Sequence, residues 1–181
     1  MFRNILFYGV IAGVVVGALM LAVTVPLMDH VSGGVGMVIG YATMLIALSA
    51  VFVGVKRYRD ADLGGVIGFW PALGMGVGIS FVAGIFYVAA WELTQAVTHM
   101  DFGHDYAKFM IAQAKAKGET GAALAKAIAD ANDFAAQYAN PLYRWPMTFV
   151  EMFPVGVLVS LITAALLRNS RFLPARSVQQ P

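Results

Sequence analysis

Residues 34–60 read GVGMVIGYATMLIALSAVFVGVKRYRD, and this stretch is the strongest indication of the fold class. Its first 22 residues, Gly34 to Val55, hold no charged side chain, and three of the next four residues are basic. A helix of about 20 apolar residues spans the hydrocarbon of a bilayer. Lysine and arginine beside such a span favour the cytoplasmic side. The stretch therefore predicts a transmembrane helix that ends at the cytoplasmic boundary.

Three further apolar runs of similar length extend this pattern along the chain. The four predicted spans cover about residues 5–28, 34–55, 66–91 and 147–167. Hydrophobic residues make up 60% of the 181 and charged residues only 12%, which is far from the composition of a water-soluble domain. We therefore predict an all-α integral membrane protein that forms a single four-helix membrane domain, residues 1–181.

The short basic segments determine the predicted orientation. When the spans alternate across the membrane, seven basic residues fall on one side: Arg3, Lys56, Arg57, Arg59, Arg168, Arg171 and Arg176. Because positive charge near span ends marks the cytoplasmic side, we assign that side to the cytoplasm. Both termini and a short tail, residues 168–181, are predicted to lie there.

The segment between the third and fourth spans, about residues 93–145, is predicted to be extracytoplasmic. The segment contains two predicted helices, separated by Gly118. In each helix the apolar side chains lie on one face, which includes Phe109 in the first helix and Ile128 in the second. Neither helix is long or apolar enough to cross a bilayer. We expect two amphipathic helices that lie on the membrane surface or cap the bundle, with Asp101 as the N-cap of the first.

Small residues recur at four-residue spacing inside the predicted spans. The pairs are Gly13 with Gly17, Gly36 with Gly40, Gly74 with Gly78, and Gly156 with Ser160. This spacing lets helix backbones approach closely, which matters in lipid because burial of apolar surface does not by itself bring helices together. Packing within the bundle is the favoured interpretation, and homodimerisation or a substrate path along the third span are the alternatives.

Several stretches resemble one known family. They are GYATMLIALS at 40–49, GVKRYRD at 54–60, YVAAWE at 87–92, NPL at 140–142 and TFVEMFPVGVLVS at 148–160. The chain resembles the bacterial membrane proteins catalogued as domain of unknown function 4199, and the resemblance is weakest in the two outer helices. It implies a four-helix membrane protein and transfers no catalytic residue. We therefore expect a multi-pass protein of the bacterial cytoplasmic (inner) membrane.

Glu151 is the most informative polar residue, because it lies inside the fourth apolar run. A charged carboxylate at the centre of a membrane helix costs on the order of 2.5–3.5 kcal/mol on insertion scales. Glu92 ends the third span, so we expect the two carboxylates at similar depths, with Arg144 close by. Two interpretations stay open: a structural role in which Glu151 pairs with Arg144 or a tyrosine, and binding of a proton, ion or substrate.

Two further groups of residues are weaker site candidates. Basic side chains after the second span can contact anionic lipid head groups, each contributing about 1 kcal/mol, or can simply set the orientation: Lys56, Arg57 and Arg59. Three histidines lie in the outer segments at spacings that only weakly suggest a zinc site: His30, His99 and His104. We predict no bound metal and no cofactor.

Three classes of function remain open. A small membrane scaffold or accessory protein fits the packing glycines and the absence of a catalytic signature. The alternative is a transporter, or a lipid- or ion-binding protein, that uses Glu151 and Glu92 in an outward-side polar cavity. An enzyme is the least favoured class, because further polar groups would have to converge on the carboxylates.

The composition also limits the partners. A net charge of +2, with basic residues beside apolar spans, argues against nucleic acid. The expected partners are membrane lipids and either a second copy of the chain or another membrane protein.

Overall fold

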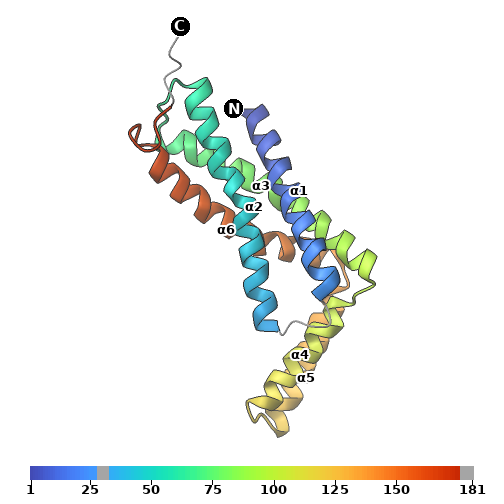
Figure 1. Ribbon diagram of the computed structural model, residues 1–181. Coiled ribbons are helices and arrows are strands. Elements are labelled where there is room, and N and C mark those ends of the chain that lie inside the picture. The colour runs from blue at the N-terminus through green and yellow to red at the C-terminus, as the bar shows by residue number, and fades with distance from the viewer. Residues whose placement is uncertain (28–32, 176–181) are drawn as a thin grey trace.

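The computed structural model describes residues 1–27 and 33–175, and this part of the chain contains six α-helices and no β-strand (Figure 1). The helices are α1 (Phe2–Leu27), α2 (Gly33–Asp62), α3 (Phe69–Thr98), α4 (Phe102–Ala116), α5 (Gly121–Tyr138) and α6 (Pro141–Leu167). Four of them, α1, α2, α3 and α6, are long and apolar enough to cross a membrane. The predicted all-α fold with four membrane-spanning helices is confirmed.

The fourth long helix begins earlier than its apolar run. α6 starts at Pro141, whereas the fourth predicted span begins at about residue 147. The side chain of Asn140 caps this helix, because its Oδ1 accepts a hydrogen bond from the Leu142 N–H at 3.0 Å. Proline fits the first helical turn, because the N–H groups there make no hydrogen bond within the helix and proline lacks only this group. Pro146 and Pro154 therefore both lie inside α6.

The four long helices pack as a bundle in which α3 lies between α1 and α6, and α2 packs against α1 and α6 (Figure 1). The start of α1 and the end of α2 meet at one end, where Asn4 Nδ2 donates to Asp62 Oδ2 at 3.2 Å. We call this the basic end, because Lys56, Arg57 and Arg59 lie there. The opposite end carries α4 and α5 and is called the hairpin end.

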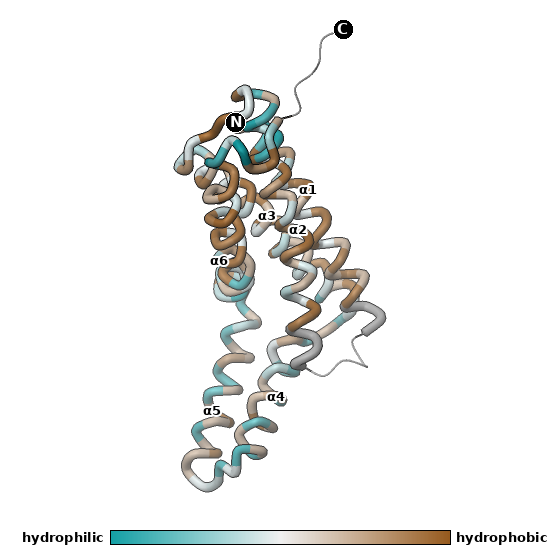
Figure 2. The backbone as a smooth tube through the Cα atoms, turned by 60° about the vertical axis from the view of Figure 1, so that its left-hand side comes forward, coloured by the Kyte–Doolittle hydropathy of each residue, from teal (hydrophilic) through white to brown (hydrophobic). Residues whose placement is uncertain are grey.

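α4 and α5 form an antiparallel hairpin that projects away from the bundle (Figures 1 and 2). The two helices contact each other through small buried side chains, Ala107, Ala131 and Ala135. The hairpin does not cover the end of the bundle, so the expectation of a cap is wrong. Its amphipathic character stays a prediction. The small alanine side chains let the two helices of the hairpin pack closely against each other.

The turns of the hairpin follow the sequence signals. Asp101 caps α4, as predicted, by accepting a hydrogen bond from the backbone N–H of His104 at 3.2 Å. This bond lowers the pKa of the Asp101 carboxyl, since it favours the ionised form. Gly118 follows α4 with φ of +79°, a backbone conformation that side-chain-bearing residues rarely adopt.

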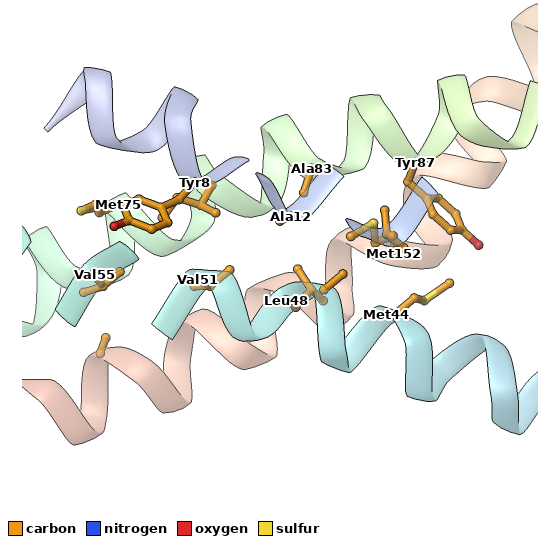
Figure 3. Packing of buried hydrophobic residues seen from close by; sticks show 14 of the residues in the cluster. Tyr8, Ala12, Met44, Leu48, Val51, Val55, Met75, Ala83, Tyr87 and Met152 are labelled. Carbon is orange, nitrogen blue, oxygen red and sulfur yellow. The ribbon is translucent and has the colours of Figure 1, made fainter. Parts of the chain in front are cut away.

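The interior of the bundle is filled with apolar side chains along its length (Figure 3). Leu48, Val51, Met75, Ile79 and Met152 have no exposed surface. They come from α2, α3 and α6 and are spread along the bundle, with Met75 beside Val55 toward the basic end and Met152 beside Tyr87 toward the hairpin end (Figure 3). Along this length the helices are therefore held by close van der Waals packing, the main attraction available between helices in lipid.

α3 and α6 cross through a reciprocal pair of small residues. Gly76 faces Ser160 and Gly156 faces Ser80, and the two serine Oγ atoms lie 3.3 Å apart. Each serine also donates to the carbonyl of the glycine four residues earlier in its own helix. The sequence pattern identified the Gly156 pair but missed Gly76 with Ser80.

Among the other predicted small residues, some contact a neighbouring helix and others have no atom near the position of a Cβ. A Cβ atom on Gly13 would lie 2.3 Å from the Cβ of Phe86, and one on Gly17 would lie 3.0 Å from the Cβ of Ala90. These two glycines therefore set the contact between α1 and α3. Gly40 and Gly74 face open space. The surroundings of Gly36 lie outside the described residues.

Candidate functional site

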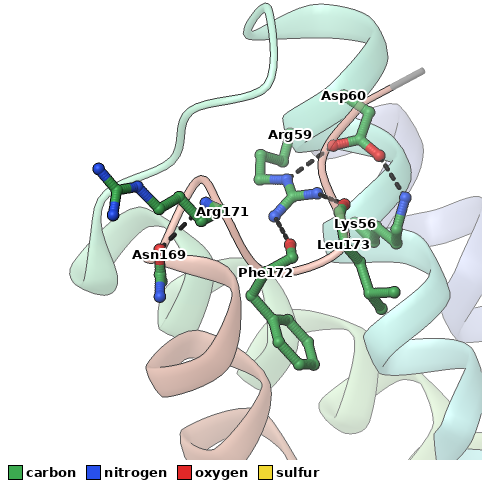
Figure 4. Close-up of polar contacts among 7 residues, drawn as sticks. All are labelled: Lys56, Arg59, Asp60, Asn169, Arg171, Phe172 and Leu173. Carbon is green, nitrogen blue, oxygen red and sulfur yellow. Dashed lines mark hydrogen bonds and ion pairs between the residues drawn. The ribbon is translucent and has the colours of Figure 1, made fainter.

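The guanidinium of Arg59 is fully enclosed by protein at the basic end (Figure 4). Its Nη1 donates to the carbonyl of Phe172 at 2.9 Å and its Nη2 to the carbonyl of Leu173 at 2.5 Å. Its Nε donates to Asp60 Oδ1 at 2.6 Å. Arg59 thus fastens residues 169–173, which we call the C-terminal strap, onto the end of α2.

One residue of the C-terminal strap, Leu173, has a strained backbone conformation. Leu173 adopts φ of 47°, in the left-handed region that disfavours residues other than glycine. Its carbonyl is one of the two acceptors of Arg59, so the buried guanidinium holds this conformation in place.

Arg59 is therefore not available for lipid head groups, which corrects that part of the sequence prediction. Lys56 pairs with the other oxygen of Asp60, and Arg57 is exposed. For these two residues, contact with anionic head groups stays a prediction.

At the hairpin end, Glu92 and Arg144 form a two-pronged ion pair between α3 and α6. The distances are 2.6 Å from Arg144 Nε to Glu92 Oε1 and 2.7 Å from Nη2 to Oε2. The third donor, Nη1, binds the carbonyl of Tyr138 at 3.1 Å. Both carboxylate oxygens of Glu92 are thus engaged by Arg144, which also ties the base of the hairpin to the bundle.

An aromatic cluster completes the base of the hairpin. Trp91 Nε1 donates to the Tyr138 hydroxyl at 2.6 Å, and the Trp91 ring meets Phe102 edge to face. Burial raises the pKa of the Tyr138 hydroxyl, since the ionised form would lose its solvation. The phenol therefore stays neutral. The bond from Trp91 to Tyr138 joins residues 47 apart in the sequence, so it depends on tertiary structure.

Glu151 lies seven residues beyond Arg144 in α6, roughly 10 Å further along the helix axis at 1.5 Å per residue. Its side chain is exposed on the surface of the bundle, beside the buried Tyr87 of α3. Among the described residues, no arginine, lysine or histidine forms an ion pair with it. Pairing of Glu151 with Arg144 is therefore not observed, because Arg144 binds Glu92. The other predicted partner, a tyrosine, stays a prediction, with Tyr87 as the neighbouring residue.

An apolar groove of about 390 Å³ runs between α3 and α6 near the hairpin end. Its lining residues are Ile85, Val88, Leu142, Trp145, Pro146, Phe149 and Val150. At 100° per residue, the α6 residues of this groove lie on the flank opposite to Glu151. Glu151 is thus on another face of α6, and Glu92 is not among the residues that line the groove. No pattern in the sequence indicated this groove.

The histidines do not assemble a metal site in the described part of the chain, where no three His, Cys, Asp or Glu side chains lie close enough to hold an ion. His104 Nδ1 lies 2.7 Å from Asp101 Oδ2, so these two form a local pair at the start of α4. His99 is exposed and ends α3 with φ of 53°. His30 lies outside the described residues.

A family model described as "Protein of unknown function (DUF4199)" matches residues 7–169. The chain belongs to this family. The match to DUF4199 includes all or nearly all of each long helix and the whole hairpin, and it confirms the resemblance seen in the sequence. Comparisons with curated proteins and with solved structures find no match. DUF4199 membership supports the membrane fold and assigns no activity.

Proposed function

We propose that this protein is a small membrane scaffold or accessory subunit, whose bundle presents the α4–α5 hairpin and one flank of α6 to another membrane protein. The observation that carries the proposal is the filled interior. Met75, Ile79 and Met152 lie at successive levels along the bundle and have no exposed surface, so they fill the space between the helices where a substrate path would have to run (Figure 3).

The hairpin supports the same function. It contacts the long helices at its base, through Trp91, Tyr138 and Arg144, and the rest projects away from them. Aromatic side chains on it keep large exposed areas, 40% for Tyr106 and 44% for Phe109. Exposed aromatic side chains on a projecting element are typical of surfaces that bind other proteins.

The alternative function, transport or ion binding by Glu151 with Glu92, has weaker support. Arg144 engages both oxygens of Glu92, so a cation shared by the two carboxylates would have to displace an arginine held by three hydrogen bonds. The groove between α3 and α6 is lined by apolar residues and includes neither carboxylate.

We further propose that the chain lies in a bacterial cytoplasmic membrane with both termini in the cytoplasm and the hairpin outside. Arg57 at the basic end and Lys117 after α4 are both exposed, so they form a matched pair of labelling positions in a chain without cysteine. In intact cells, a membrane-impermeant thiol reagent should label Lys117→Cys and not Arg57→Cys. After permeabilisation both should react. Labelling of Arg57→Cys alone in intact cells would reverse the orientation.

The scaffold function predicts specific protein contacts in the membrane. A photoreactive amino acid in place of Phe109 on the hairpin, and another in place of Leu158 on α6, should each form an adduct with the same protein in cells. Ala72, which is fully buried in the bundle, supplies the control position and should give no intermolecular adduct. Adducts with lipid alone from both exposed positions would contradict the proposal.

A flux measurement separates the scaffold from the transporter. Purified protein in vesicles with a proton or sodium gradient should add no flux to that of protein-free vesicles. A flux that Glu151→Gln abolishes would instead establish the alternative function.

A further inference from the structure

The position of Glu151 in α6 places its carboxylate at hydrocarbon depth. α6 begins at Pro141, and Trp145 marks the boundary region, where tryptophan is enriched. Glu151 is six residues past Trp145, roughly 9 Å further along the axis at 1.5 Å per residue. Its side chain is too short to bring the carboxylate back to the boundary. Acidic residues at such depth nearly always face a protein interior, a water-filled cavity or a partner charge.

The surface around Glu151 offers acceptors. Pro154 has no N–H, so the carbonyl of Val150, one turn earlier, has no partner within the helix. The free carbonyl points toward Pro154, which is three residues beyond Glu151 and therefore on the same side of α6. Tyr87, beside Glu151, has one hydroxyl proton to offer. A group that binds both the carboxylate and the carbonyl must carry several hydrogen-bond donors. A lysine ammonium or an arginine guanidinium does so.

The residues around Glu151 form a surface on which another helix can lie. Met147, Glu151, Pro154 and Leu158 follow one another at spacings of four, three and four residues, which places them on one flank of α6. All four are exposed. We call them the Glu151 flank.

A second copy of the chain does not supply the missing cation. Arg144 is the one lysine or arginine within the hairpin-end halves of the four described long helices, and Glu92 and the Tyr138 carbonyl already use its donors. Two copies joined through this flank by a two-fold axis would bring two Glu151 carboxylates together, which is unfavourable for like charges.

We propose that the Glu151 flank binds a transmembrane helix of a different protein, and that this helix carries a lysine or arginine at the depth of Glu151. The ammonium or guanidinium group donates to the Glu151 carboxylate and to the Val150 carbonyl, while Met147 and Leu158 pack against apolar side chains of the partner helix. This inference rests on the proposed scaffold function and names the class of its partner.

Synthetic transmembrane helices can stand in for the partner helix in a direct test. The full-length protein is reconstituted in phosphatidylcholine vesicles, and its association with a labelled leucine-rich transmembrane peptide is measured by energy transfer. The peptide carries a single lysine, leucine or glutamate at the depth of Glu151. The lysine peptide should bind about fivefold more tightly than the leucine peptide, as expected for one interhelical polar contact in a membrane. The glutamate peptide should bind no better than the leucine peptide.

The variant Glu151→Gln should remove the lysine preference, while the matched control Asp133→Asn on the exposed face of α5 should keep it. Equal binding of the lysine and leucine peptides to the wild-type protein would overturn the proposal, and this comparison does not depend on how any variant folds. A lysine preference that survives Glu151→Gln would also overturn it.

Two other occupants of the flank would be recognised in the same system. If labelled copies of the protein associate with each other and Glu151→Gln abolishes this, the flank binds a second copy. If phosphatidylethanolamine vesicles abolish the lysine preference, a lipid ammonium fills the site. Either result overturns the proposal. If the peptides fail but Phe109 still forms its protein adduct in cells, the scaffold function stands and only this inference falls.

Discussion

Replacing Arg59 by methionine is expected to lower the free energy of unfolding by about 1–3 kcal/mol, because the substitution removes the charged donor of two partly buried carbonyls. The acceptors of Phe172 and Leu173 lie against a guanidinium without exposed surface, so water does not simply replace it. The strained backbone at Leu173 should then relax, and the C-terminal strap should detach from α2. Denaturant titration in mixed micelles measures the stability.

Strap release has its own measurement. Trypsin cleavage after Arg171, which is exposed in the strap, should become at least about tenfold faster, since a detached segment is open to protease for a larger fraction of time. Arg57→Met is the matched control, because Arg57 is two residues away and exposed, and its loss should change stability by no more than about 0.5 kcal/mol. Identical stability and cleavage rates for the two variants would show that Arg59 does not hold the strap.

Gly156→Ala is expected to destabilise the bundle by about 1–3 kcal/mol, because the added methyl group has no room at the crossing of α3 and α6. It would lie 2.6 Å from Ser80 Cβ and 2.7 Å from Ser80 Oγ. Cβ is fixed to the backbone, so α3 and α6 must move apart. That movement would also separate the Ser80 and Ser160 hydroxyls, which lie 3.3 Å apart.

The packing explanation has a control and a rescue. Gly74→Ala in α3 adds the same methyl group where nothing lies within 4 Å, and it should be neutral or slightly stabilising. Ser80→Gly removes the clashing Cβ and should restore part of the stability lost in Gly156→Ala. If Gly156→Ala and Gly74→Ala have equal effects, or if Ser80→Gly only adds to the loss, close packing at this crossing is not the cause.

The number and type of the long helices could be predicted from the sequence, and their ends less well. The 22 uncharged residues from Gly34 to Val55 predict a span by length and composition alone. α6, however, extends back to Pro141 because the Asn140 side chain caps it, and polar residues can continue a helix past its apolar run. The sequence did not predict that the hairpin projects from the bundle. The apolar faces of α4 and α5 show that each helix packs against something, but not whether that is the other helix or the bundle.

In the candidate site too, the residues could be predicted from the sequence but their partners could not. The sequence singled out Glu151, Glu92 and Arg144 as polar residues near the ends of two spans. Which carboxylate Arg144 binds depends on the rotation of α6 against α3, and the structure pairs it with Glu92. Arg59 was predicted as one of three similar basic residues. Only the return of the chain at Phe172 and Leu173 distinguishes it from Arg57.

That the chain forms four helices able to span a membrane follows from its sequence, because the length and apolarity of each segment are local properties. The sequence also contains the small residues that permit close helix contact. The folded structure is needed to learn which glycines meet a neighbour, which arginine is enclosed and which carboxylate has no cationic partner among the described residues. These outcomes depend on how helices rotate and cross, which is set by contacts between residues far apart in the chain.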